Sequence, residues 1–98
     1  MTDYSKIPSP CFVVDEKLLR RNLGIVAGVA ERAGVEVILA LKANAMWSIF
    51  PIIGEYVHGA TASSLNEARL VSEQFGVQPH TYAPVYTDRD IEPLLDLS

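Results

Sequence analysis

A single lysine, Lys42, ends the most apolar run of the sequence. Between Val35 and Leu41, directly after Gly34, five of seven residues are branched or long aliphatics, a pattern that predicts a buried strand. Burial disfavours the ammonium form of lysine, so an amine at the end of such a strand tends towards its neutral, nucleophilic form. Neutral lysine amines form Schiff bases with carbonyl groups, including that of pyridoxal phosphate. Lys42 is therefore the candidate catalytic residue.

The competing interpretation is that Lys42 simply extends into solvent, as most lysines at strand ends do. Side chains alternate along a strand, so Ala40 shares the strand face of Lys42. A small residue beside the amine leaves room for a flat group, which favours the functional interpretation.

Other residues that could take part in chemistry have simpler structural explanations. Ser64 and Glu67 have the spacing of a capping box, in which both side chains satisfy backbone donors at a helix start. His58 and His80 have no partner at metal-ligand spacing, so no metal site is predicted. Cys11 lies in a short apolar run and is expected to be a buried, inert thiol.

The elements that must position Lys42 alternate between strand and helix. Before Gly34, a strand is predicted over 11–14 and a helix over 16–33, with Asp15 as its cap. After Gly34, the pattern predicts strands over 35–41, 60–63 and 81–83, and helices over 49–57, 65–75 and from 87 or 88 onward, with Ser48 as a cap of the second helix.

This alternation predicts an α/β fold with parallel strands and right-handed crossovers. A closed barrel needs roughly 250 residues, and three strands alone would leave both sheet edges unpaired. The chain is therefore expected to be the opening part of a (β/α)₈ barrel. Barrel enzymes place their chemistry at the carboxyl ends of the strands, where Lys42, Ser63, Ser64 and the segment 84–88 converge.

Composition narrows the class of protein. The net charge is −4 with no basic stripe, which argues against a nucleic-acid partner. No signal peptide and no apolar run long enough to span a membrane is present, so a cytoplasmic location without membrane contact is expected. The single cysteine supports no internal disulfide.

Two runs together resemble the carboxynorspermidine decarboxylase family. They are L-A-L-K-A-N-A-M-W-S-I-F-P, which contains Lys42, and G-A-T-A-S-S-L-N-E-A-R-L, which contains Ser64 and Glu67. This family belongs to the fold-type-III pyridoxal-phosphate enzymes, with ornithine and diaminopimelate decarboxylases and alanine racemase. The resemblance runs from Pro8 to about Asp90 and corresponds to roughly the first third of such an enzyme.

The resemblance implies a function and a site. Lys42 would hold pyridoxal 5′-phosphate as a Schiff base, with Ser64 and Glu67 near the cofactor. The substrate would be a polyamine with one α-amino-acid end, carboxynorspermidine or carboxyspermidine, decarboxylated to norspermidine or spermidine. The full-length enzyme would be a homodimer.

The resemblance also implies a domain organisation. Residues 1–14 would be a tail and a strand that joins a second, β-rich domain, and residues 15–98 would be a partial barrel. Several cofactor-binding parts of the family lie beyond Ser98, so the 98 residues alone are not expected to be active.

Two positions bear on alternatives within the wider group. Thr61 stands where many ornithine-type decarboxylases have aspartate, which favours the carboxynorspermidine branch, whereas Asn44 resembles the diaminopimelate and racemase branches. A diaminopimelate decarboxylase, an alanine-racemase-type enzyme and a non-catalytic pyridoxal-phosphate-binding barrel therefore remain alternatives. A small flavodoxin-like module is disfavoured because no glycine-rich loop follows the lysine strand.

Overall fold

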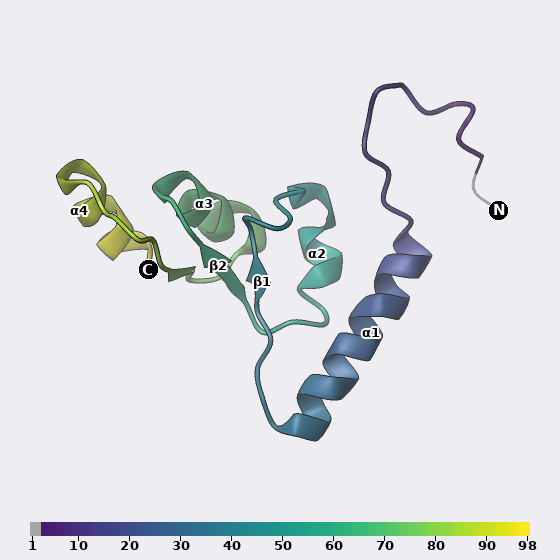
Figure 1. Ribbon diagram of the computed structural model, residues 1–98, viewed down its shortest axis with the longest axis horizontal. Helices are drawn as coiled ribbons and strands as arrows, with labels where there is room; N and C mark the ends of the chain where they lie inside the picture. Colours follow the sequence, from purple (N-terminus) through teal and green to yellow (C-terminus); the bar gives the residue numbers. More distant parts are fainter. Residues whose placement is uncertain (1–2) are drawn as a thin grey trace.

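The computed structural model describes residues 3–98, and a long N-terminal helix is followed by three strands with helical segments between and after them (Figure 1). The elements are α1 (Glu16–Ala33), β1 (Leu39–Ala40), η1 (Trp47–Ile49), α2 (Phe50–Ile53), β2 (Ala60–Ala62), α3 (Leu65–Leu70), η2 (Val71–Phe75), β3 (His80–Thr81) and α4 (Asp88–Leu97).

The first helix begins and ends at the predicted residues. The Asp15 carboxylate accepts hydrogen bonds from the amides of Lys17 and Leu18 at 3.0 and 3.2 Å, which satisfies two of the unpaired donors of the first turn. Gly34 ends the helix with φ of 68°, in the left-handed region that costs glycine little.

The three strands form one parallel sheet in the order β1-β2-β3. Leu39 pairs with Ala60, and Ala40 with Thr61. Thr61 and Ala62 in turn pair with His80 and Thr81. The predicted α/β class with parallel strands is thus confirmed. The regular strands are shorter than predicted, with two residues each in β1 and β3 and three in β2.

The helical connections agree with the prediction only in part. α3 continues into η2, a π-helical turn, and ends at Gly76 with φ of 75°, as predicted. The predicted helix over 49–57 was too long, because the helical stretch runs from η1 to the end of α2 at Ile53. Ser48 does not cap it, since it lies inside η1. Thr87 is the N-cap residue of α4, and the helix continues through Pro93.

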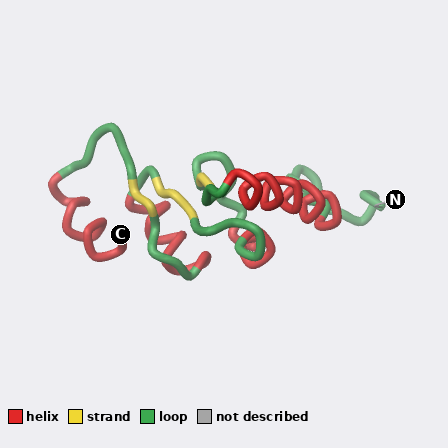
Figure 2. The backbone as a smooth tube through the Cα atoms, turned by 90° about the horizontal axis from the view of Figure 1, so that it is seen from below, coloured by secondary structure: helices red, strands yellow, loops and turns green. Residues whose placement is uncertain are grey.

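The core lies between the sheet and the helices that follow the strands. In Figure 2, α3 and α4 lie on the same side of the strands. Phe50 is 1% exposed, and its ring centroid is 5.3 Å from that of Phe75. Small side chains on β2 and α3 let these elements approach closely. The buried cluster comprises Leu41, Phe50, Ala60, Ala62, Ala68, Val71 and Leu94.

A polar cluster joins α1 to the turn that follows α2, and the two helices lie side by side (Figure 1). Arg20 donates to Glu55 at 2.5 Å and to Glu16 at 3.2 Å. The Tyr56 hydroxyl, together with Glu55 and Glu16, raises the pKa of the Arg20 guanidinium above its ordinary value. The cluster is exposed, so it orients the two helices more than it stabilises them.

The segment before α1 differs from the prediction. Residues 11–14 form no strand and pair with no strand of the described chain. Cys11 is exposed, so the prediction of a buried thiol was wrong, and the Phe12 side chain is 95% exposed. An apolar run becomes a strand only where a partner supplies hydrogen bonds and cover, and the described residues supply neither here. Within residues 3–98, no helix combines the length and apolar character needed to cross a membrane.

Candidate active site

Three loops meet at the carboxyl end of the sheet, as expected for parallel strands. Backbone pairing continues just past the regular strands, because the Leu41 amide donates to Thr61 O at 3.3 Å and the Tyr82 amide to Ala62 O at 3.0 Å. Lys42, Ser63 and Ala83 are the residues at which the three loops begin. The predicted convergence of these loops is confirmed.

The two faces of the sheet carry different side chains. Leu41, Ala60 and Ala62 are buried against the helices. The opposite face, which we call the open face, carries Ala40, Thr61 and His80, aligned with one another by the strand register. Its side chains are small or polar, and none of them belongs to the buried cluster.

Three further residues lie at the carboxyl end of the sheet, just past its paired residues. Lys42, Ser63 and Tyr82 each follow a residue of the aligned set by two positions. Neighbouring strands lie about 4.8 Å apart, so the backbones of these residues follow one another across the end of the sheet. We call Lys42, Ser63 and Tyr82 the terminal row.

Lys42 itself is solvent-exposed, which corrects the prediction of a buried, unsolvated amine. It occupies a turn in which the Ala43 amide donates to Ala40 O at 3.0 Å. The turn carries the lysine beyond the last paired residue, Leu41, and three strands cannot enclose the end of the sheet. The amine is accessible, and a ligand or further protein would have to supply any desolvation.

Asn44 fixes the loop that carries Lys42. Its Oδ1 accepts a hydrogen bond from the Met46 amide at 2.9 Å, a local side-chain-to-backbone bond of the kind that stabilises turns. The Asn44 amide itself donates to Ala40 O at 3.2 Å. The side chain that resembles other branches of the enzyme group therefore has a structural task in this loop.

Ser64 and Glu67 form the predicted cap of α3, with one change of partner. The Glu67 amide donates to Ser64 Oγ at 3.1 Å, while Glu67 Oε1 accepts from the amide of Ser63, at 3.0 Å, instead of that of Ser64. Glu67 is partly buried, and within the described chain its Oε2 has no hydrogen-bond partner. One carboxylate oxygen thus holds the backbone of the terminal row, and the other can still accept a hydrogen bond.

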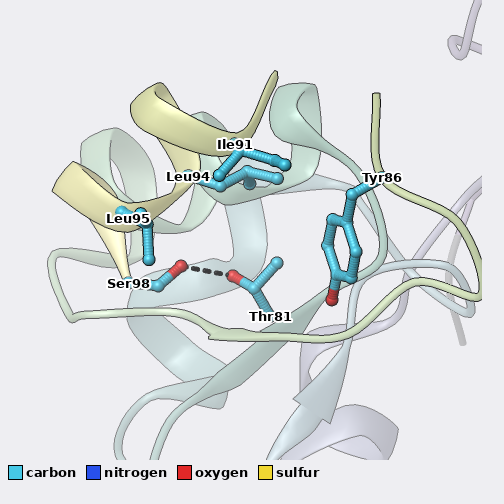
Figure 3. Close-up of a pocket in the computed structure, with 6 residues that line it drawn as sticks. All are labelled: Thr81, Tyr86, Ile91, Leu94, Leu95 and Ser98. Atoms are coloured by element: carbon cyan, nitrogen blue, oxygen red, sulfur yellow. Dashed lines mark hydrogen bonds between the residues drawn. The ribbon is translucent and has the colours of Figure 1, made fainter. Parts of the chain in front are cut away.

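Two cavities lie near α4, and neither contains Lys42. The larger, of about 290 Å³, is almost wholly apolar. Figure 3 shows Ile91, Leu94 and Leu95 projecting into it from α4, Tyr86 on its other side, and the Thr81 and Ser98 hydroxyls 2.6 Å apart. The smaller, of about 130 Å³, lies between the loops after β2 and β3 and is lined in part by Ser63, Ser64 and Asp90. The larger cavity offers almost no polar groups to a ligand, so we place the candidate site at the terminal row.

The two histidines have structural or exposed positions, as the sequence analysis expected of them. Among the described residues, no group of three or more His, Cys, Asp or Glu could hold a metal ion. His58 lies at the opposite end of the sheet, where its Nδ1 accepts from the Val37 amide at 3.1 Å. His80 is exposed on the open face.

Tyr82 is the site residue that the sequence analysis missed. It was assigned only to a strand, although the alternation along that strand, once registered against β2, places it in the terminal row. The position of Tyr82 depends on which residues pair between strands, and this pairing cannot be read from the sequence.

Comparison with known proteins shows which enzymes the chain is similar to. No family model matches the chain. The chain is 46% identical over 94 residues to a carboxyaminopropylagmatine decarboxylase from Synechocystis sp. and 38% identical over 89 residues to a carboxynorspermidine/carboxyspermidine decarboxylase from Herminiimonas arsenicoxydans. These matches cover 96% and 91% of the chain but 24% of each relative.

A solved structure gives the same result. The crystal structure of carboxynorspermidine decarboxylase from Campylobacter jejuni, complexed with norspermidine, superposes with a TM-score of 0.88 at 37% identity, over 94% of this chain and 25% of that one. The resemblance inferred from the two sequence runs is thus confirmed. The chain spans about a quarter of the length of the relatives it matches.

Proposed function

We propose that this chain supplies part of the active site of a pyridoxal-phosphate-dependent decarboxylase in polyamine biosynthesis, with carboxynorspermidine or carboxyspermidine as substrate. The observation that carries the proposal is the position of Lys42, an accessible amine just past β1, at the same end of the sheet as Ser63 and Tyr82. The similarity to decarboxylases over more than nine-tenths of the chain supports the reaction class.

The residues present fit the carbonyl end of pyridoxal phosphate. An aldehyde needs a primary amine, and Lys42 offers one on a face where Ala40 and Thr61 leave space for a flat ring. The three loops carry no arginine and no glycine, so residues outside these loops would hold the phosphate. When bound, the cofactor supplies an electron sink for the pair released as carbon dioxide leaves.

The other roles in the site are assigned to residues of this chain. Lys42 would hold the cofactor through its side-chain amine. Asn44 fixes the loop of Lys42, and Glu67 fixes the backbone of Ser63 through its Oε1. The unpaired Oε2 of Glu67 and the hydroxyl of Ser64 are the groups we assign to the cofactor side of the site. Both residues also cap α3, and the two roles are compatible because the cap uses only one carboxylate oxygen.

A second substrate fits the comparisons. The 46% identity to a carboxyaminopropylagmatine decarboxylase exceeds the 38% identity to the carboxynorspermidine enzymes. Agmatine ends in a guanidinium group where norspermidine ends in an ammonium group, so the reacting end is shared and the cationic arm differs. Carboxyaminopropylagmatine is therefore the alternative substrate.

The wider organisation belongs to the same proposal. We assign residues 15–98 to a (β/α)₈ barrel and residues 1–14 to a tail and strand that join a β-rich domain. We also propose that the full-length protein is a homodimer in the cytoplasm, without a nucleic-acid or membrane partner. Sedimentation of the full-length protein tests the dimer.

The decisive experiment maps the cofactor. The full-length protein is reduced with borohydride, digested, and searched for a pyridoxyl adduct. We expect the adduct on Lys42 and not on Lys17, an exposed lysine of α1 that serves as the matched control. Absence of an adduct at Lys42 would refute the cofactor assignment. If the adduct forms, carbon dioxide release from carboxynorspermidine and from carboxyaminopropylagmatine distinguishes the two substrates.

A further inference from the structure

Tyr82 is an exposed aromatic side chain at the candidate site with no role in the fold. Its ring is 73% exposed. Its backbone is fixed, because its amide donates to Ala62 O at 3.0 Å. Its hydroxyl makes no hydrogen bond to any described residue. By contrast, the hydroxyl of nearby Tyr86 accepts from the Ala83 amide at 2.9 Å, so Tyr86 closes its own loop.

The strand register fixes the face on which Tyr82 stands. Thr81 pairs with the buried Ala62, and its hydroxyl meets Ser98 of α4, on the helix-covered face (Figure 3). Alternation then places Tyr82 on the open face, in the terminal row. Two strand spacings, about 10 Å, separate the backbones of Lys42 and Tyr82. A ligand held at Lys42 that extends across β2 therefore reaches the ring of Tyr82.

The chemistry of this face selects a cation. On the Lys42 side of Tyr82, the residues of the open face and the terminal row other than Lys42 carry no charge. These residues are Ala40, Thr61 and Ser63. His80 lies two residues before Tyr82 on the same strand face. The face of a tyrosine ring attracts cations through its quadrupole, and this attraction grows when the pair is shielded from water.

We propose that Tyr82 is a specificity residue whose ring face receives a cationic nitrogen of the substrate's polyamine arm. The proposal rests on the proposed function, since it requires the reacting end of the substrate to lie at Lys42. The proposal about Tyr82 assigns a contact to the polyamine arm of the substrate, whereas the proposed function places only the reacting end of the substrate. Either an ammonium or a guanidinium nitrogen meets the requirement.

The test compares Tyr82→Phe, which keeps the ring, with Tyr82→Leu, which removes it. Tyr82 is exposed, so neither change should impair folding. Binding of norspermidine to the full-length protein is measured by calorimetry, and KM and kcat are measured with carboxynorspermidine and carboxyaminopropylagmatine. Tyr86→Phe is the control, a tyrosine of the same loop on the covered side.

We expect Tyr82→Leu to raise both the Kd for norspermidine and the KM by about three- to thirtyfold with little change in kcat. Tyr82→Phe and Tyr86→Phe should stay within about twofold of the unaltered protein, because the ring–cation attraction remains. For a substrate analogue with methylene groups in place of the arm nitrogens, Tyr82→Leu should change KM by less than about twofold.

Three outcomes would overturn the proposal: unchanged binding in Tyr82→Leu, an equal loss in Tyr82→Phe, or an equal loss with the uncharged analogue. The failure of the underlying function looks different. In that case the unaltered protein would carry no adduct at Lys42 and would release no carbon dioxide, and both proposals would fall together. An adduct and turnover combined with unchanged binding in Tyr82→Leu would remove the inference about Tyr82 alone.

Discussion

The carboxylate of Glu67 lies 3.0 Å from the backbone amide of Ser63 and accepts its hydrogen bond. This bond links the first turn of α3 to the residue that directly follows β2, so a single side chain determines both where the helix begins and how the terminal row is held. A residue assigned to the cofactor side of the site is thus also part of the local fold.

Replacing Glu67 should separate these two tasks. Glu67→Ala removes the acceptor for the Ser63 amide and should lower the free energy of unfolding by about 1 kcal/mol, the usual value of a helix cap. Glu67→Gln keeps an acceptor oxygen and should cost less than about 0.5 kcal/mol. Urea denaturation of the two variants measures the difference. Equal losses in both would show that the charge, and not the Ser63 bond, provides the stability.

Replacing Lys42 should affect chemistry and not folding. The side chain is exposed and makes no hydrogen bond or ion pair with the described residues, so Lys42→Ala should change the free energy of unfolding by less than about 0.5 kcal/mol. Turnover should nevertheless be lost, because among residues 3–98 Lys42 is the lysine at this end of the sheet. Lys17→Ala, at an exposed site on α1, is the control for charge removal. Residual turnover near normal in Lys42→Ala would contradict the assignment.

Asn44 should influence turnover through the loop it stabilises. Asn44→Ala removes the bond to the Met46 amide and should cost about 1 kcal/mol of stability. We expect a lower kcat as well, because Lys42 lies in the loosened turn. Asn44→Asp keeps the acceptor and should retain most of the stability. A kcat for Asn44→Ala equal to that of Asn44→Asp would show that the loop position is set by other contacts.

Two glycines of the α1 region should respond in opposite directions to alanine. Gly34 has φ of 68°, so Gly34→Ala should destabilise the protein by about 1–2 kcal/mol. Gly24 lies inside the helix with open space at its Cβ position, so Gly24→Ala should stabilise by about 0.5–1 kcal/mol. Thermal unfolding of both variants gives the comparison. A stabilising Gly34→Ala would mean that the helix end relaxes away from the left-handed conformation.

The sequence alone was sufficient for features that depend on residues close together in the chain. Asp15 and Gly34 determine where α1 begins and ends, and the spacing of Ser64 and Glu67 determines the start of α3. The alternation of apolar strands with helical stretches was enough to predict parallel pairing, and the apolar run before Lys42 identified the candidate amine. Caps, turns and hydrophobic periodicity act over a few residues, so they can be read directly.

Features that depend on partners distant in the chain were decided by the tertiary structure. Residues 11–14 have strand composition but find no strand partner among residues 3–98, and the regular strands β1 and β3 have only two residues each. The exposure of Lys42 follows from the number of strands around it, which no local pattern encodes. The terminal row of Lys42, Ser63 and Tyr82 arises from the register between strands, set by packing and hydrogen bonds across tens of residues. A shift of one residue in that register would turn Tyr82 to the helix-covered face, which is why only the folded chain could show it at the site.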